Sequence, residues 1–362
     1  MVASDRGLGR LYSLGEEFPM TFLAMLPQSF GCSTSATSSD DEARCDRTGD
    51  LLKRPVFLVG SECSGTTLLR LMLDHHPRIA FFFEFQYSVA KMPERTGWPD
   101  LTEYCDYLEG DRIFRAARLS VDPTLDYPHL IDSFLRQKRD RDHKDVVGAV
   151  VHYDYDRLLR IWPDARFLHI IRDGRDVAQS AMAHGWGGNL YSAAYKWLDA
   201  EELWSRFSAE LPPDRYHEVR YEDLVRFPEE VLDRICEFIG VPYDRAMFDY
   251  IHDSTFSAPS PARLDKWRTA LSPYELQLAE ARMGDMLVAR GYPLSGLPRL
   301  KITPTLRRRL WLQNRMACSS FRRRRYGILL WMAKLFSSRL PLRSLDRALQ
   351  RRIDKVDERF LK

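Results

Sequence analysis

The sequence predicts an α/β protein with a P-loop-like three-layer fold, in which helices flank a central, mostly parallel sheet. Short apolar and β-branched runs that are typical of buried strands recur along the chain. Each run is followed by a loop and then by a stretch of helical periodicity, and the first of these loops is bounded by glycines. Strands that alternate with helices favour a parallel sheet, because parallel neighbours need a crossover connection.

The composition is that of an ordinary globular protein. Of the 362 residues, 44% are hydrophobic and 29% are charged, which excludes wholesale disorder and leaves ample core for one large α/β domain or two small ones. The six cysteines are scattered without a Cys-x-x-Cys pair, so we expect reduced thiols and no metal site. No apolar stretch reaches the roughly 18 residues of a membrane span. Residues 18–26 lack the flanks of a signal peptide, and we expect a cytoplasmic protein.

Composition and charge divide the chain into three regions. Residues 1–50 form a Ser/Thr/Asp-rich flexible leader, residues 51–298 the main domain, and residues 299–362 a basic helical extension. The extension has 19 Lys and Arg against 4 Asp and Glu, a net +15, so the remainder carries −12 (3 − 15). Its apolar run Tyr326–Phe336 follows four arginines, which favours peripheral contact with a membrane. Packing on the acidic body is the alternative, and without a recognised module we expect no nucleic-acid partner.

The stretch from Arg54 to Leu73 carries the clearest functional signal. Residues 55–59 predict a buried strand, residues 60–65 a loop and the following residues a helix. Strand, glycine-bounded loop and helix form the geometry in which backbone N–H groups and the helix dipole hold a phosphate. The spacing of Gly60 and Gly65 matches a Walker loop, but Thr66-Thr67 replaces the required Lys-Ser or Lys-Thr. An ATPase or P-loop kinase therefore fits poorly.

Two further strands are expected to end in candidate bases. Residues 79–83 predict a strand with Glu84 at its end, and residues 146–151 predict a strand that ends at His152. The carboxyl ends of parallel strands line the ligand crevice, so both side chains should face the site of the first loop. The alternatives are a salt-bridged or solvated Glu84 and a His152 hydrogen-bonded at the crevice rim. Aromatic residues at 81–87 and Trp186 suggest an aromatic-lined acceptor pocket.

A second anion-binding corner is expected after the strand predicted at residues 166–171. That strand ends in Arg172-Asp-Gly-Arg-Asp, and Ser180 follows in the next helix. Arginine offers a planar fork of donors that suits phosphate oxygens. An arginine salt-bridged to a neighbouring aspartate is the alternative. Two such corners in one sheet suit a nucleotide with phosphates at both ends.

Together these motifs resemble the PAPS-dependent sulfotransferases, closest to the bacterial and tyrosylprotein-type branch. The resemblance runs in order through residues 54–298. It rests on Ser64-Gly-Thr-Thr-Leu-Leu, His76-Pro77 with the following glutamate, the segment Pro163–Val177, Tyr221-Glu-Asp-Leu, Phe238-Ile-Gly and Trp267-Arg268.

The resemblance implies transfer of a sulfuryl group from the co-substrate PAPS (3′-phosphoadenosine 5′-phosphosulfate) to a hydroxyl or amine, by in-line displacement and without a metal. It implies that Glu84 is the general base, and we rank His152 second. The first loop would hold the 5′-phosphosulfate, and Arg172 with Ser180 the 3′-phosphate. The implied PAPS-binding residues are Ser61, Cys63, Ser64, Gly65, Thr66, Thr67, Arg172, Ser180 and Tyr221, with Lys266 and Arg268 as looser correspondences.

One position departs from the family pattern. Members of the family normally carry Arg or Lys immediately before Ser-Gly-Thr-Thr, whereas this chain has Cys63 preceded by Glu62. We expect weaker PAPS binding or slower transfer unless Arg70, Arg78 or Lys266 supplies the cation. A nucleophilic Cys63 is the less favoured interpretation. The alternative function is a catalytically weakened module that binds PAPS or its product PAP. A small molecule, glycan, lipid or tyrosine-like hydroxyl all fit as acceptor.

Overall fold

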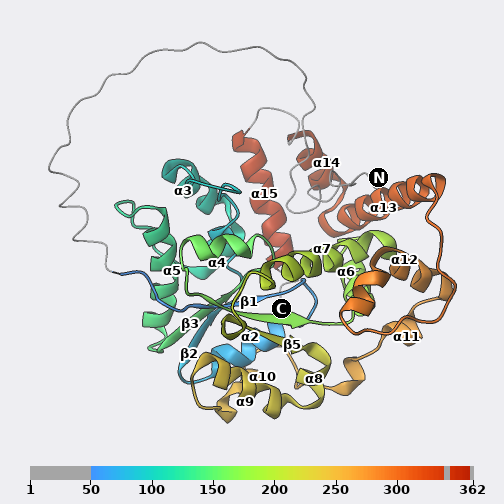
Figure 1. Cartoon of the computed structure of the whole chain (residues 1–362). Coiled ribbons are helices and arrows are strands. Elements are labelled where there is room, and N and C mark those ends of the chain that lie inside the picture. The colour runs from blue at the N-terminus through green and yellow to red at the C-terminus, as the bar shows by residue number, and fades with distance from the viewer. Residues whose placement is uncertain (1–49, 338–342, 359–362) are drawn as a thin grey trace.

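The structure is a computed structural model, and its described residues are 50–337 and 343–358. One sheet of five strands has the order β2-β3-β1-β4-β5, and every neighbouring pair is parallel (Figure 1). This confirms the predicted α/β fold with a central parallel sheet. The strands are β1 (Val56–Val59), β2 (Ile79–Phe82), β3 (Val146–Val150), β4 (Arg166–Ile171) and β5 (Tyr216–Arg220).

Helices connect the strands and cover both faces of the sheet. The α-helices of the main domain are α2 (Thr66–His75), α3 (Leu101–Gly110), α4 (Arg112–Ala117), α5 (Tyr127–Arg141), α6 (Gly174–Ala183), α7 (Leu190–Ser208), α8 (Tyr221–Arg226), α9 (Pro228–Ile239), α10 (Tyr250–Asp253), α11 (Trp267–Ala270) and α12 (Pro273–Ala289). Short 3-10 helices are η2 (Gln86–Ser88), η3 (Tyr155–Arg160), η4 (Pro213–Arg215), η5 (Arg245–Phe248) and η6 (Pro261–Arg263).

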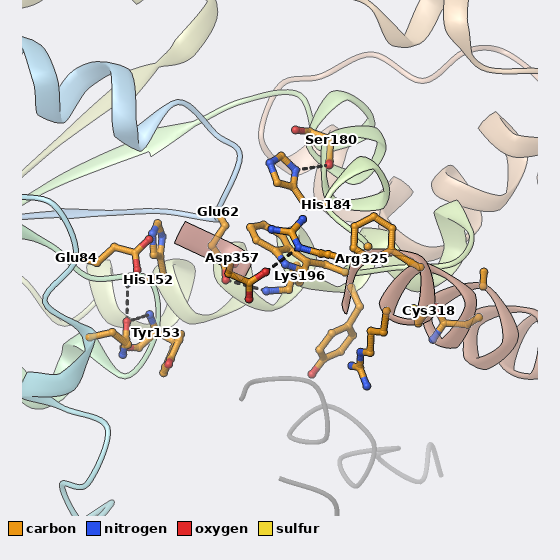
Figure 2. Close-up of a pocket in the computed structure, with 18 of the residues that line it drawn as sticks. Glu62, Glu84, His152, Tyr153, Ser180, His184, Lys196, Cys318, Arg325 and Asp357 are labelled. Atoms are coloured by element: carbon orange, nitrogen blue, oxygen red, sulfur yellow. Dashed lines mark hydrogen bonds and ion pairs between the residues drawn. The ribbon is translucent and has the colours of Figure 1, made fainter. Parts of the chain in front are cut away.

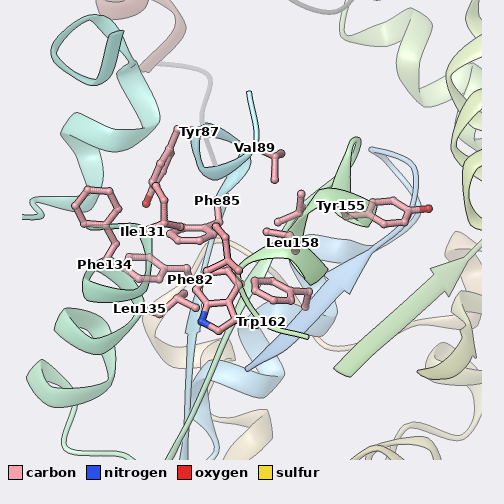
Figure 3. Close-up of a cluster of buried hydrophobic side chains, with 14 of the residues drawn as sticks. Phe82, Phe85, Tyr87, Val89, Ile131, Phe134, Leu135, Tyr155, Leu158 and Trp162 are labelled. Carbon is pink, nitrogen blue, oxygen red and sulfur yellow. The ribbon is translucent and has the colours of Figure 1, made fainter. Parts of the chain in front are cut away.

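Both faces of the sheet are buried, because alternate side chains of each strand enter opposite cores. In β1, Phe57 and Val59 join a core with α3, α4, α5 and η3, in which Figure 3 shows Phe134 and Trp162. Val56 and Leu58 join the core of α2, α8 and α9 on the other face. A third core lies between α6, α7 and α12. This layering fixes the carboxyl ends of the strands at one edge.

α8 begins directly where β5 ends, and Glu222 and Asp223 lie in its first turn. Acidic side chains in a first helical turn interact favourably with the positive end of the helix dipole.

Three helices follow the main domain: α13 (Pro304–Tyr326), α14 (Ile328–Ser337) and α15 (Arg343–Glu358). α13 is attached to the start of α7, where Asn189 Nδ2 donates to the Leu310 carbonyl at 2.8 Å and Asn314 Oδ1 accepts from the Gly188 N–H at 2.6 Å. α15 is attached to α4 by Arg115 and Asp354 at 2.8 Å. Among the described residues, no helix has both the length and the apolar character of a membrane span. The expected leader, except Asp50, lies outside the described residues.

Candidate active site

All five strands place a candidate site residue at the same edge of the sheet. The first loop follows β1, Glu84 follows β2, His152 follows β3, Arg172 follows β4 and Tyr221 follows β5. The first loop, Glu84 and His152 also border a cleft of about 2600 Å³. The parallel sheet thus brings together residues that lie far apart in the sequence.

The first loop is shaped to approach an anion closely. Gly60 and Gly65 have φ angles of 144° and 102°, and a Cβ on Gly65 would lie 2.3 Å from the ring of Tyr221. Within the described chain no side chain caps α2, so its first N–H groups and the positive end of its dipole face the loop. Ser64 is buried, and its Oγ has no hydrogen-bond partner among the described residues. These features fit a phosphate-binding loop.

Arg172 connects the first loop to α8. Its guanidinium donates to the carbonyls of Cys63 and Arg263, both at 3.3 Å, and lies 4.5 Å from the ring centroid of Tyr221. It also pairs with Asp176 at 3.4 Å, which is the salt bridge expected as the alternative. Its Nε is buried and has no hydrogen-bond partner in the described part of the chain. Arg172 therefore has both a structural partner and an unused donor.

Ser180 reaches the first loop through Cys63. Ser180 lies on α6 and lines the cleft (Figure 2). Its side chain acts on Cys63 as a hydrogen-bond partner that lowers the pKa of the thiol. Burial raises the pKa of Cys63 above its ordinary value, and Glu62 adds to that shift. The thiol is therefore protonated near neutrality, which disfavours the nucleophilic interpretation.

Lys266 immediately precedes α11, and Arg268 lies within it. The start of α11 is held against α6, because the Trp267 N–H donates to Asp176 at 2.9 Å. Both basic side chains are exposed, and the Arg268 guanidinium stacks 4.3 Å from the Trp267 ring centroid. Neither is among the described residues that line the cleft. The structure therefore places Trp267 beside Asp176, in the predicted second anion-binding corner, whereas the side chains of Lys266 and Arg268 lie on the protein surface.

Glu84 and His152 face the same cleft, as Figure 2 shows. The backbone N–H of His152 donates to Gln86 Oε1 at 3.0 Å. His152 Nδ1 lies 2.9 Å from the carbonyl of Gly60. A carbonyl only accepts, so Nδ1 carries a proton, and the neutral ring has its lone pair on Nε2. His152 is therefore hydrogen-bonded at the rim and still keeps one nitrogen that can accept a proton.

Lys196 is the site residue that sequence reasoning missed. It projects from α7, and its Nζ lies 2.7 Å from a carboxylate oxygen of Glu62 (Figure 2). Burial raises the pKa of Glu62, but the charge of Lys196, joined by that of His152 when its ring is protonated, outweighs burial and leaves that pKa below its ordinary value. α7 carries no motif, so the one available signal was an acidic residue in a loop that is predicted to bind an anion.

Arg70 and Arg78, which were also expected as replacements for the missing cation at position 63, lie at opposite ends of the strands. Arg70 lines the cleft, and burial lowers its pKa although Asp74 and Glu84 oppose that shift. Arg78 pairs with Asp145 at 2.7 Å, just before β2 and β3 begin. It lies at the opposite edge from the first loop, so the expectation that it could replace the missing cation is wrong.

The cleft has one wall from the main domain and one from the C-terminal helices. Aromatic residues from the first wall include Phe83, Tyr87 and Trp186, as the sequence suggested. α3 and α4 add Tyr107 and Arg112, and α13 adds several arginines. The cleft thus offers aromatic surface and positive charge near the candidate bases.

Residues 55–245 match the model of the family described as "Sulfotransferase family", which is more than half of the chain. The matched segment includes the first loop, Glu84, His152, Arg172, Ser180 and Tyr221, and it ends before the loop that leads into α11.

Individual relatives cover a similar part of the chain. It is 26% identical over 223 residues to a protein-tyrosine sulfotransferase of Drosophila melanogaster, covering 58% of this chain and 42% of the relative. It is 26% identical over 221 residues to protein-tyrosine sulfotransferase 2 of Gallus gallus, covering 58% and 57%. The matches span less than two thirds of either relative. The sulfotransferase domain from the curacin biosynthetic pathway, a solved structure, is 20% identical with a TM-score of 0.45, covering 68% of this chain and 100% of that one.

Proposed function

The chain belongs to the sulfotransferase family, and on that premise we propose that it transfers a sulfuryl group from PAPS to a hydroxyl or amine acceptor. The observation that carries the proposal is the contact of Arg172 with both the first loop and Tyr221. It joins two anion-binding corners beside a cleft that holds two candidate bases, Glu84 and His152. A donor nucleotide with phosphates at both ends suits this arrangement.

The unpaired polar atoms support a phosphorylated ligand. Ser64 Oγ and Arg172 Nε are buried without hydrogen-bond partners among the described residues. A buried polar group without a partner costs about 1–3 kcal/mol, and phosphate oxygens would provide partners for both. In our proposal Ser64, Thr66 and Thr67 bind the 5′-phosphosulfate, and Arg172 with Ser180 binds the 3′-phosphate. The protein then catalyses transfer chiefly by positioning the acceptor and stabilising charge on the departing phosphate.

A base must accept the acceptor proton as its oxygen or nitrogen attacks sulfur. We assign this role to Glu84, which lines the cleft two residues after β2. His152 is the second candidate, because its Nε2 can accept a proton while Nδ1 is bonded to Gly60. The two assignments differ in which substitution, at Glu84 or at His152, should change the pH dependence of the rate.

Lys196 is our candidate for the cation that position 63 lacks. Its ammonium group has three donors, and the described contact with Glu62 uses one of them. The carboxylate of Glu62 holds the Lys196 ammonium group beside the first loop, where negative charge develops on the leaving group. A cation held there would be worth about 2–4 kcal/mol of transition-state stabilisation.

One observation favours a second function. Cys63 occupies the position of the expected cation, and Glu62 beside it is negatively charged. On that basis the alternative is a module that binds PAPS or PAP and transfers sulfate slowly or not at all. Binding and transfer must therefore be measured separately.

The test begins with thermal unfolding in the presence of PAP or ATP. A ligand that binds only the folded protein raises Tm, by an amount that grows with the logarithm of ligand concentration over Kd. We expect PAP to raise Tm and ATP to have no comparable effect; no response to PAP would overturn both functions. Transfer of labelled sulfate from PAPS to phenolic, lipid, glycan and amine acceptors then separates the enzyme from the binding module.

A further inference from the structure

α14 presents its apolar side chains to solvent. Ile328, Leu329, Met332 and Phe336 are 61%, 85%, 41% and 56% exposed. In a helix with about 100° between successive residues, these four fall on one face. Soluble proteins seldom leave such a stripe uncovered, and exposed apolar patches mark sites of interaction.

The polar side of α14 is the side that packs against the protein. Lys334 pairs with Asp346 of α15 at 2.8 Å, and Ser337 Oγ donates to the same carboxylate at 2.7 Å. Lys334 lies on the opposite side of the helix from Leu329 and Met332. The helix is therefore inverted relative to an ordinary amphipathic helix of a globular protein, which buries its apolar face. Figure 1 shows α14 at the periphery of the molecule, beside α15.

Positive charge borders this apolar face. Near its C-terminus α13 carries Arg322, Arg323 and Arg324, all exposed, and one glycine, Gly327, separates α13 from α14. The whole segment 299–362 carries a net +15. A second copy of the chain would bring the same positive charge to the face, so self-association is disfavoured. A surface that is both apolar and anionic complements the stripe and the arginines together.

We propose that α14 and Arg322–Arg324 bind the surface of an anionic lipid bilayer. α14 lies in the plane of the interface with Leu329 and its neighbours among the acyl chains, and the arginines contact lipid phosphates. The flank of α14 next to this face, with Trp331 and Leu335, lines the cleft. Docking therefore brings the cleft to the membrane surface. This binding does not depend on the proposed chemistry and can be tested without it.

The experiment is flotation of the full chain with vesicles of phosphatidylcholine alone or mixed equally with phosphatidylglycerol. We expect binding to the mixed vesicles only, weakened by added salt. Replacing Arg322, Arg323 and Arg324 with Gln should reduce affinity by about fivefold for each arginine, or about a hundredfold together. Leu329→Glu should reduce it by about ten- to hundredfold. The matched control is Val288→Glu, which adds the same charge at an exposed apolar residue of α12 (58% exposed) and should bind as the parent does.

Three outcomes would overturn the proposal. Equal binding to both vesicle types, or to neither, removes the role of anionic lipid. If the arginine variant no longer binds vesicles but Leu329→Glu binds as the parent does, the protein is adsorbed by charge alone and α14 has no role. If the parent protein forms a dimer that Leu329→Glu dissociates, and does not bind vesicles, the exposed face of α14 serves self-association. Circular dichroism and PAP-induced change in Tm establish that each variant is folded.

Discussion

The Nζ atom of Lys196 lies 2.7 Å from the carboxylate of Glu62, so α7 delivers a positive charge to the first loop. The neighbouring residue, Cys63, is neutral because burial raises its pKa. The cation that the sequence lacks at position 63 is thus available from a different element. We therefore expect the rate of transfer to depend on Lys196 as well as on the residue at position 63.

Replacing Lys196 with Met should lower kcat by about 30- to 1000-fold, because about 2–4 kcal/mol of charge stabilisation is lost from the transition state. Lys196→Arg should retain most of the activity, and PAP binding should change less than kcat. Lys196 could instead serve only to neutralise Glu62. In that case the double variant Lys196→Met/Glu62→Gln would recover activity, and our assignment would be wrong.

Cys63→Arg should raise turnover. The substitution places a guanidinium beside the leaving phosphate, and residue 63 already has a left-handed backbone (φ 68°) that Arg would share with Cys. The measurement is kcat with labelled PAPS and one acceptor found in the panel. Cys63→Ser, which changes the side chain without adding charge, is the control. Unchanged or lower turnover in Cys63→Arg would indicate that Lys196 already fills the role.

Arg172→Gln should weaken PAP binding by about ten- to hundredfold, since hydrogen bonds to charged groups contribute about 1.5–3 kcal/mol. Titration calorimetry gives the Kd directly. Arg268→Gln is a suitable control, because Arg268 is exposed and stacks on Trp267. If the two substitutions weaken PAP binding equally, the segment around α11 also contacts the nucleotide. If neither substitution weakens PAP binding, Arg172 does not bind the 3′-phosphate.

Glu84→Gln should reduce kcat by about 10²–10⁴-fold, the usual contribution of a general base. Where the rate of the parent protein rises with pH because the base loses its proton, that rise should be absent in the variant that lacks the base. We therefore expect it to be absent in Glu84→Gln and to persist in His152→Asn. His152→Asn keeps a side chain that can donate to the Gly60 carbonyl, so it tests proton transfer with little change in the loop. If the rise of the rate with pH is lost in His152→Asn and retained in Glu84→Gln, His152 is the base and our assignment is wrong.

The fold and most of the site were predictable because they depend on local patterns. Apolar runs and glycine positions gave the strands, and the rule that ligands bind at carboxyl ends of parallel strands grouped Glu84, His152 and Arg172 correctly at one edge. Lys196 was not predictable, because its role depends on the packing of α7 against a loop distant in sequence. The orientation of α14 was equally hidden: its apolar run predicts a helix, but which side is exposed depends on contacts such as the Lys334–Asp346 pair.

A buried charge cluster connects β4, β5 and α7 behind the site. His169 is fully buried; its Nε2 lies 3.3 Å from Glu201 and its Nδ1 3.3 Å from Glu218, while Arg290 pairs with Glu201 at 2.8 Å. The His169 ring stacks on Trp204 with a centroid distance of 4.3 Å. Burial lowers the pKa of His169, but the two glutamates outweigh burial and raise it above the ordinary value. The bond from His169 lowers the pKa of Glu218 to about 2.

These shifts predict how stability depends on pH. A raised histidine pKa contributes stability that is fully present below its unfolded value of about 6.5 and is lost as pH rises through the folded value. The depressed pKa of Glu218 contributes stability that is present above the unfolded value of about 4.5 and is lost as pH falls toward about 2. Urea unfolding should therefore give a free energy of unfolding that decreases from about pH 6 to about pH 9. The decrease should be smaller in His169→Gln, whatever its absolute stability, and equal slopes in the two proteins would contradict a charged His169.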